Sequence, residues 1–221
     1  MRINIAIDGP SAAGKSTIAR RLAAKLGYVH LDTGAMYRCT AYKALQEKLD
    51  LEDEKAICAM LKNTKIELTP DGKVLLDGKD VSHEIRQDEI SLAASKVSRH
   101  PQVRKDLVAR QQQMAAARGF IMDGRDIGTV VLKDAEVKVF MTASAYARAR
   151  RRYDQNIACN IPTSSIEEIA KEIEERDYQD THRAASPLKK AEDAVEVDTS
   201  DMTIDEVTEA IYKLAEPYIT K

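Results

Sequence analysis

The segment that most constrains this chain is Gly9–Ser16, which reads GPSAAGKS. It fits the spacing G-x-x-x-x-G-K-[ST], in which glycines let the backbone turn tightly and bring its N–H groups close to an anion. The apolar run Ile3–Ile7 precedes the motif. Ile18, Leu22 and Leu26 follow it at a helical spacing. A motif between a predicted strand and a predicted helix indicates a phosphate-binding loop rather than a chance turn of small residues.

The loop predicts roles for its own residues. Lys15 brings a positive charge near the β- and γ-phosphates of a nucleotide, and the Ser16 hydroxyl is placed to ligate Mg²⁺. The helix that follows directs its positive N-terminal end at the same phosphates. The residues predicted to bind ATP are Gly9, Pro10, Ser11, Ala12, Ala13, Gly14, Lys15, Ser16 and Thr17.

The rest of the chain repeats the strand–helix rhythm. Further short apolar runs predict strands at 28–31, 120–124, 137–142 and 194–198. Amphipathic helices are expected after residue 33, over about 87–118, and after the capping pair Thr203 and Glu206. This order predicts an α/β fold with a doubly wound parallel sheet of five strands in a single domain spanning 1–221.

Two segments interrupt the rhythm. Residues 65–81 alternate apolar and polar side chains and contain two Asp-Gly pairs, which predicts a small insert of three antiparallel strands. A surface hairpin that only packs is the alternative. Residues 144–183 predict two long polar helices, the second capped by Ser165 and Glu168, which together form a helical lid.

Composition excludes several classes of protein. With 34 basic and 36 acidic residues, the net charge of −2 argues against bulk attraction to nucleic acid or membranes. Cys39, Cys58 and Cys159 lie far apart, which predicts reduced thiols rather than a disulfide framework or a zinc site. No leader or membrane-spanning segment is evident, so we expect a soluble, cytoplasmic protein. Because no long heptad or apolar patch is evident, we expect a monomer.

Arginines are grouped at helical spacing in the predicted lid. One helix carries three arginines on one face, and the next carries two arginines and an aspartate on one face. The residues are Arg148, Arg151 and Arg152 on the first helix, and Arg176, Asp180 and Arg183 on the second. A solvated charged face would give the same spacing, but the phosphate loop in the same chain favours a lid that closes on polyphosphate.

Further charged residues follow predicted strands or adjoin them. Arg38, Arg125 and Asp126 stand near such ends, as do Asp8, Asp32 and Asp123. Ligands of open α/β sheets bind outside the carboxyl ends of the strands, so these residues are candidates for the same site.

The sequence offers no strong general base, because its four histidines are scattered. A kinase acting on a sugar hydroxyl benefits from a base, whereas an acceptor phosphate is already anionic and needs cations to hold it. Many arginines without a base therefore favour a nucleoside monophosphate as acceptor. The guanine-reading motif N-K-x-D is missing, which argues against a GTPase switch.

Four motifs together, DGPSAAGKST, DTGAMYR, DGRDIGTVV and ERDYQDTHR, closely resemble bacterial cytidylate kinases. The resemblance spans nearly the whole chain, including the β insert. It implies transfer of a phosphoryl group from ATP to CMP or dCMP, with Mg²⁺. It also implies a core (about 1–35, 86–143 and 186–221), a monophosphate-binding region (about 36–85) and a lid (about 144–185).

The resemblance further implies roles for individual residues. The CMP phosphate would be held by Arg38, Arg125 and Arg183. The cytosine would face Thr33, Arg104 and Asp126, and the sugar would lie near Ser95, Arg176 and Asp180. Lys15, Arg148, Arg151 and Arg152 would stabilise the transferring phosphoryl group. Two alternatives stay open: a kinase of another small acceptor such as UMP, AMP or shikimate, and a non-catalytic ATP-binding module.

Overall fold

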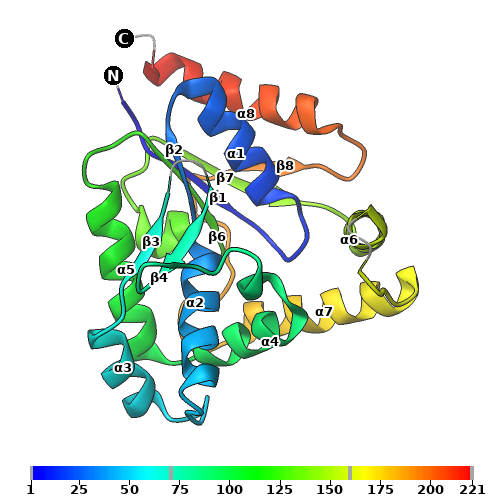
Figure 1. Ribbon diagram of the computed structural model, residues 1–221. Helices are drawn as coiled ribbons and strands as arrows, with labels where there is room; N and C mark the ends of the chain where they lie inside the picture. Colours follow the sequence, from blue (N-terminus) through cyan, green and yellow to red (C-terminus); the bar gives the residue numbers. More distant parts are fainter. Residues whose placement is uncertain (1, 70–71, 159–160, 220–221) are drawn as a thin grey trace. The chain divides into compact units, whose positions relative to one another are not determined.

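The computed structural model describes residues 2–69, 72–158 and 161–219 of the chain (Figure 1). It divides into two compact units. The first combines the two ends of the chain, Met1–Tyr28 and Arg118–Lys221, and the second is Val29–Ala117.

A parallel sheet has the strand order β2-β6-β1-β7-β8. Its strands are β1 (Ile5–Asp8), β2 (Val29–Asp32), β6 (Phe120–Gly124), β7 (Val137–Thr142) and β8 (Val195–Asp198). β1 pairs in parallel with β6 on one side and β7 on the other, and every residue of β1 is buried. The predicted five-stranded parallel sheet is confirmed.

The core of the first unit lies between this sheet and two helices. Helix α1 (Lys15–Leu26) and helix α8 (Ile204–Ile219) contribute Ile18, Leu22 and Ile211 to an apolar cluster with the side chains of β1 and β7. Gly27 ends α1 in the left-handed conformation, as its position predicts. This packing holds the end of β1 and the start of α1 in a fixed relation, and the phosphate loop joins them.

Gly9 is required where the chain leaves β1. Its φ is 151°, and a Cβ atom at this position would lie 2.1 Å from the carbonyl oxygen of Met141 in β7. Only a residue without a side chain can turn so close to the neighbouring strand. Glycine is therefore required at the first position of the motif for two reasons: the chain passes close to β7 there, and the loop turns tightly.

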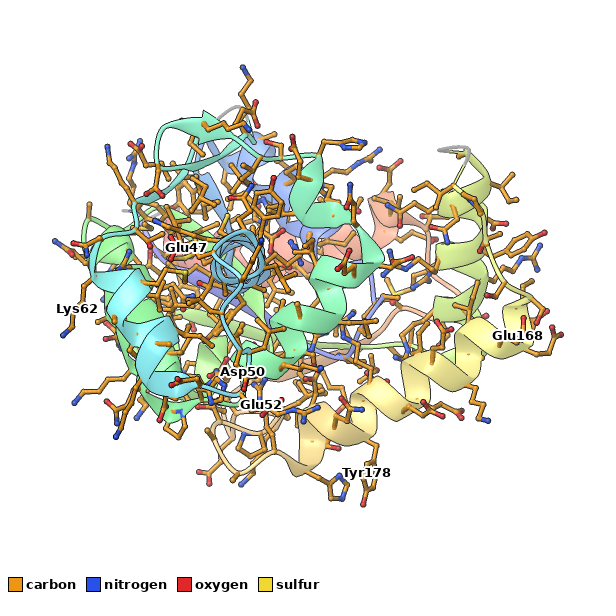
Figure 2. The ribbon with its side chains drawn as sticks, turned by 60° about the horizontal axis from the view of Figure 1, so that its bottom comes forward. Glu47, Asp50, Glu52, Lys62, Glu168 and Tyr178 are labelled. Atoms are coloured by element: carbon orange, nitrogen blue, oxygen red, sulfur yellow. The ribbon has the colours of Figure 1, made fainter. Side chains whose placement is uncertain are left out.

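Helices α6 (Ala145–Ala158) and α7 (Ile166–His182) pack against each other around Ala149, Ile169 and Ile173. The predicted cap is confirmed. The Ser165 hydroxyl accepts a hydrogen bond from the backbone N–H of Glu168, and the Glu168 carboxylate accepts one from Ser165. Figure 2 shows Glu168 at one end of α7 and Tyr178 towards the other.

The second unit contains four α-helices in its described residues. They are α2 (Thr33–Gln46), α3 (Glu54–Lys62), α4 (Asp88–Val97) and α5 (Pro101–Ala115), with a short 3₁₀ turn η1 (Glu84–Arg86) before α4. Helix α3 was not predicted. The local sequence nonetheless contains two features typical of a helix. Asp53 caps the N–H of Ala56, and Ile57 and Leu61 form a buried face.

The β insert also belongs to the second unit. It forms an antiparallel sheet in the order β3-β4-β5, with β3 at Ile66–Leu68, β4 at Val74–Leu76 and β5 at Lys79–Asp80. The predicted three strands are confirmed. Asp77 and Gly78 both have positive φ in the turn between β4 and β5, as expected for an Asp-Gly hairpin. Asp71 of the other predicted turn lies outside the described residues, as does Cys159.

Within the described ranges, no helix combines the length and apolar character needed to cross a membrane.

Candidate active site

The phosphate loop joins β1 to α1 through backbone turns with positive φ. Ala12 and Gly14 have φ values of 57° and 86°, in the left-handed region. Such turns direct successive N–H groups towards one point. The carbonyl of Gly14 accepts hydrogen bonds from Thr17 and Ile18, so α1 begins directly behind the loop. The sequence prediction of a loop between strand and helix is confirmed.

Lys15 folds back onto its own loop. Its Nζ donates a hydrogen bond to the carbonyl oxygen of Pro10 at 2.7 Å, and the residue is buried. Burial lowers the pKa of Lys15 to about 7, with the nearby positive charge of Arg125 acting in the same direction. The carboxylates of Asp123 and Asp8 oppose this shift only in part. The lowered pKa therefore reflects mainly the burial of the ammonium group.

Two buried carboxylates stand at the ends of neighbouring strands. Asp8 accepts hydrogen bonds from the backbone N–H groups of Ile127 and Gly128, each at 2.7 Å. Burial raises the pKa of Asp8 to about 6, although both hydrogen bonds act to lower it. Ile127 begins a π-helical turn, η2 (Ile127–Val131), which was not predicted. Asp8 thus anchors the segment that follows β6.

The second carboxylate lies beside the predicted metal ligand. The Ser16 hydroxyl donates to Asp123 Oδ2 at 2.6 Å, so two hard oxygen donors are adjacent. In the described part of the chain, no three His, Cys, Asp or Glu side chains form a cluster that could hold a metal ion. These donors fit Mg²⁺, which is usually held by one or two protein oxygens together with phosphate and water oxygens.

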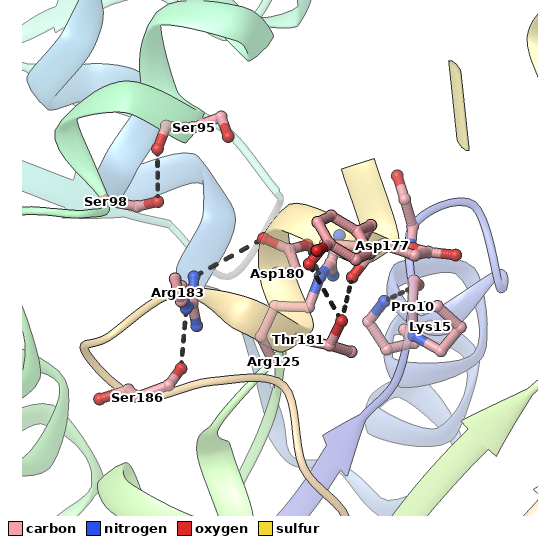
Figure 3. Close-up of polar contacts among 12 residues, drawn as sticks. Pro10, Lys15, Ser95, Ser98, Arg125, Asp177, Asp180, Thr181, Arg183 and Ser186 are labelled. Carbon is pink, nitrogen blue, oxygen red and sulfur yellow. Dashed lines mark hydrogen bonds and ion pairs between the residues drawn. The ribbon is translucent and has the colours of Figure 1, made fainter. Parts of the chain in front are cut away.

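Arg125, Asp180 and Arg183 form a charged cluster that is largely shielded from solvent (Figure 3). Arg125 Nε donates to Asp180 Oδ2 at 2.7 Å, and Arg183 Nη1 lies 3.7 Å from Asp180 Oδ1. Burial acts to raise the pKa of Asp180, but Arg125 and Arg183 hold it below its usual value. Two guanidinium groups therefore share the Asp180 carboxylate, and the charges of Asp177 and Asp123 also act on Arg125.

Two of the three α6 arginines already have protein partners. Arg148 is buried and donates to the Ser11 carbonyl at 3.0 Å and to the carboxylate of Asp177 on α7. Arg151 donates to the hydroxyl and carbonyl of Thr199, directly after β8. Arg152 is half-buried. The alternative of a purely solvated charged face therefore does not hold for Arg148, which reaches the phosphate loop.

In the second unit, Arg38 and Asp32 form an ion pair of 2.8 Å at the start of α2. Asp32 also accepts a hydrogen bond from Ala35 N at 2.9 Å and so caps the helix. The Nε of Arg38 is buried and has no hydrogen-bond partner among the described residues. A buried donor of this kind suits an anionic ligand.

The other predicted ligands of the second unit lie on three helices. Thr33 is the first residue of α2 and is buried, and Ser95 lies on α4. Arg104, on α5, is 4% exposed and donates to the Ser98 carbonyl at 3.2 Å. Its guanidinium stands 5.3 Å from the centre of the Tyr37 ring, which holds it in place.

Some features of the first unit went beyond the sequence prediction. Asp177 was not predicted, although it directly follows Arg176 and contacts the phosphate loop through Ser11 N at 3.1 Å. Ser11 and Asp177 are 166 positions apart, so no spacing pattern within a helix or strand could have predicted their contact. Arg176, by contrast, was predicted near Asp180, and its positive charge helps to lower the pKa of that carboxyl group.

Comparison with known proteins decides the family. The family model for cytidylate kinase matches residues 5–217. The chain belongs to the cytidylate kinase family. It is 51% identical to a cytidylate kinase of Geobacillus sp. (strain WCH70) over 215 residues, covering 96% of each chain. It is 50% identical to the Bacillus subtilis (strain 168) cytidylate kinase over 218 residues, covering 97% of each.

Solved structures agree on the fold of this cytidylate kinase family member. A shikimate kinase from Bacteroides thetaiotaomicron has a TM-score of 0.50 at 11% identity, covering 98% of this chain and 99% of that one. A gluconokinase from Sinorhizobium meliloti 1021 also has a TM-score of 0.50, at 15% identity, covering 97% and 93%. Similarity at this level establishes the P-loop kinase fold alone.

Proposed function

We propose that this chain transfers the γ-phosphoryl group of ATP to CMP or dCMP, giving ADP and CDP or dCDP. The observation that carries the proposal is the match to the cytidylate kinase family over residues 5–217, nearly the whole chain. The fold adds a phosphate loop with left-handed turns and one buried arginine, Arg148, on the same unit. The enzyme is accordingly a transferase that uses ATP.

For the ATP side, we propose that the loop Gly9–Thr17 holds the phosphates through its backbone N–H groups. Lys15 would stay close to the γ-phosphoryl group during transfer and offset its negative charge. Lys15 now donates to Pro10 O, a neutral acceptor, and a phosphate oxygen would be a stronger one. Ser16, adjacent to Asp123, would hold Mg²⁺. When bound, Mg²⁺ would offset the negative charge of the ATP phosphates.

For the acceptor side, we propose that Arg38, Arg125 and Arg183 hold the CMP phosphate. The two guanidinium groups that share the Asp180 carboxylate and the buried Nε of Arg38 support this role. An acceptor phosphate needs no general base, so positioning and charge neutralisation suffice for transfer. Arg148, Arg151 and Arg152 would add positive charge from the lid.

For the nucleoside, we propose that Thr33, Arg104 and Asp126 read the cytosine, and that Ser95, Arg176 and Asp180 lie near the sugar. Asp126 is 5% exposed and Arg104 is 4% exposed, so each is shielded from water enough for a hydrogen bond to discriminate. The arrangement into core, monophosphate-binding region and lid, the monomeric state and the cytoplasmic location stay predictions.

Acceptor selectivity tests the function. ADP formation from ATP and Mg²⁺ would be measured with no acceptor and then with CMP, dCMP, UMP, AMP and shikimate in turn. We expect rapid ADP formation with CMP and dCMP, and slow formation with the other three acceptors. Turnover that prefers AMP or shikimate would overturn the proposal. ATP binding without turnover of any acceptor would favour a non-catalytic module.

A further inference from the structure

The carboxylate of Asp177 makes a contact that phosphoryl transfer does not explain. Asp177 lies within α7, away from both ends of the helix, yet its Oδ1 accepts a hydrogen bond from the backbone N–H of Ser11 at 3.1 Å. Ser11 is the third residue of the phosphate-loop motif. A negatively charged side chain is therefore bonded to a backbone donor of the loop.

The same carboxylate also engages the buried arginine of the lid. Asp177 Oδ2 accepts from Arg148, whose guanidinium additionally donates to the carbonyl of Ser11. The side chains of Arg148 and Asp177 are 7% and 19% exposed, so water screens their attraction only weakly. Asp177 thus binds one backbone N–H group and one guanidinium group, and a polyphosphate would bind both of these groups as well.

We propose that Asp177 is an internal competitor of ATP, which occupies part of the phosphate-binding position of the loop and holds Arg148 until the nucleotide arrives. Carboxylate and phosphate oxygens carry negative charge and accept the same N–H donors, so the two cannot both hold the Ser11 N–H and Arg148. The inference rests on the proposed binding of ATP phosphates by Gly9–Thr17.

The competition has a thermodynamic consequence. The apparent dissociation constant of a ligand rises when only a fraction of the protein is competent to bind it. Each chain in which Asp177 occupies the loop is temporarily unavailable to ATP. Removing the negative charge should therefore tighten ATP binding, whereas the loss of a residue that merely supports the loop would weaken it.

The experiment measures ATP affinity by calorimetry without any acceptor, in the unaltered chain and in Asp177→Asn. Asparagine keeps the size of the side chain and an acceptor for Ser11 N–H, but it lacks the charge. We expect the dissociation constant for ATP to fall about 3- to 10-fold, corresponding to a competing state populated at about 70–90%. Asp177→Ala should change it in the same direction and serves as the second variant.

Glu175→Gln is the matched control. Glu175 is exposed on the same helix and carries the same charge, so this change removes one negative charge without touching the loop. We expect its ATP affinity to stay within about twofold of the unaltered chain, since exposed charges are well screened. Equal tightening in Glu175→Gln would show a general effect of charge and would overturn the proposal.

Unchanged or weaker ATP binding in folded Asp177→Asn and Asp177→Ala would also overturn it. Weaker binding would mean that Asp177 positions Arg148 in the nucleotide complex instead. Turnover of CMP by the unaltered chain is assayed separately. If the unaltered chain binds ATP but does not phosphorylate CMP, the proposed function fails, while the competition can still be measured.

Discussion

Lys15 Nζ donates to the carbonyl of Pro10, five residues earlier in the same loop, at 2.7 Å. The ammonium group of the phosphate-loop lysine is thus held inside the loop by a neutral oxygen. The contact is local and involves no side chain of the sheet. If the loop binds ATP as proposed, this contact keeps the lysine near the γ-phosphate position.

Lys15→Ala should keep the fold and lose activity. The substitution removes a buried cation whose pKa is lowered by burial and by Arg125, so little folding energy depends on its charge. We expect a loss on the order of 10²–10⁴ in kcat, as for other groups that stabilise transferring charge. Arg20→Ala, which removes an exposed cation from the same helix, is the control. Near-normal turnover of folded Lys15→Ala would rule out the assigned role.

The lid helices should become more protected when both substrates are present. If α6 and α7 close over ATP and CMP through Arg148, Arg151 and Arg152, hydrogen exchange of 145–158 and 166–182 should slow with both ligands bound. Helix α8, in the same unit, packs against α1 and should exchange at an unchanged rate. Equal exchange of α6 and α7 with and without substrates would contradict lid closure.

Asp180→Asn should destabilise the fold at neutral pH. The change leaves the largely buried side chain of Arg125 without its partner carboxylate at 2.7 Å, which we expect to cost about 3 kcal/mol of unfolding free energy. The side chain of Asp180 is 11% exposed, so solvent screening is limited. Urea unfolding of the variant and the unaltered chain at pH 7 measures the difference.

The contribution of Asp180 should also depend on pH. Because the pKa of Asp180 is lowered in the fold, its carboxylate stabilises the chain fully above its ordinary value of 3.8. This stabilisation is lost as the pH falls below that value and through the folded pKa. The difference between the unaltered chain and Asp180→Asn should thus be constant from pH 7 to 5 and shrink below pH 4. A constant difference down to pH 3 would contradict the ion-pair account.

Asp126→Asn should alter the choice of base. Cytosine presents an exocyclic amine where uracil presents a carbonyl, so a carboxylate pairs with the first and faces another acceptor in the second. Carboxylate-to-amine pairing is worth about 1–3 kcal/mol of discrimination in base readout. The amide of asparagine can rotate to donate, so kcat/KM should fall for CMP and the gap to UMP should narrow by about 10-fold. An unchanged CMP/UMP ratio would remove Asp126 from the proposed base-reading role.

Much of this molecule could be predicted from the sequence because the signals are local. The glycines of GPSAAGKS, the apolar runs of the five strands, and the cap formed by Ser165 and Glu168 depend on neighbours within a few residues. Backbone conformation and periodic burial are properties of such short segments. Helix α3 had the same kind of signal in Asp53, Ile57 and Leu61 and could have been found.

The tertiary structure alone decided which charged groups meet. The lid arginines have suitable spacing on α6, but nothing in that spacing shows that Arg148 reaches Ser11 while Arg151 binds Thr199. Likewise, Asp177 stands among many acidic residues of α7, and only its position in the fold brings it to the loop. Contacts between residues more than a hundred positions apart depend on how the helices pack on the sheet. Sequence periodicity specifies which face of a helix is buried. It does not specify which polar groups then become neighbours.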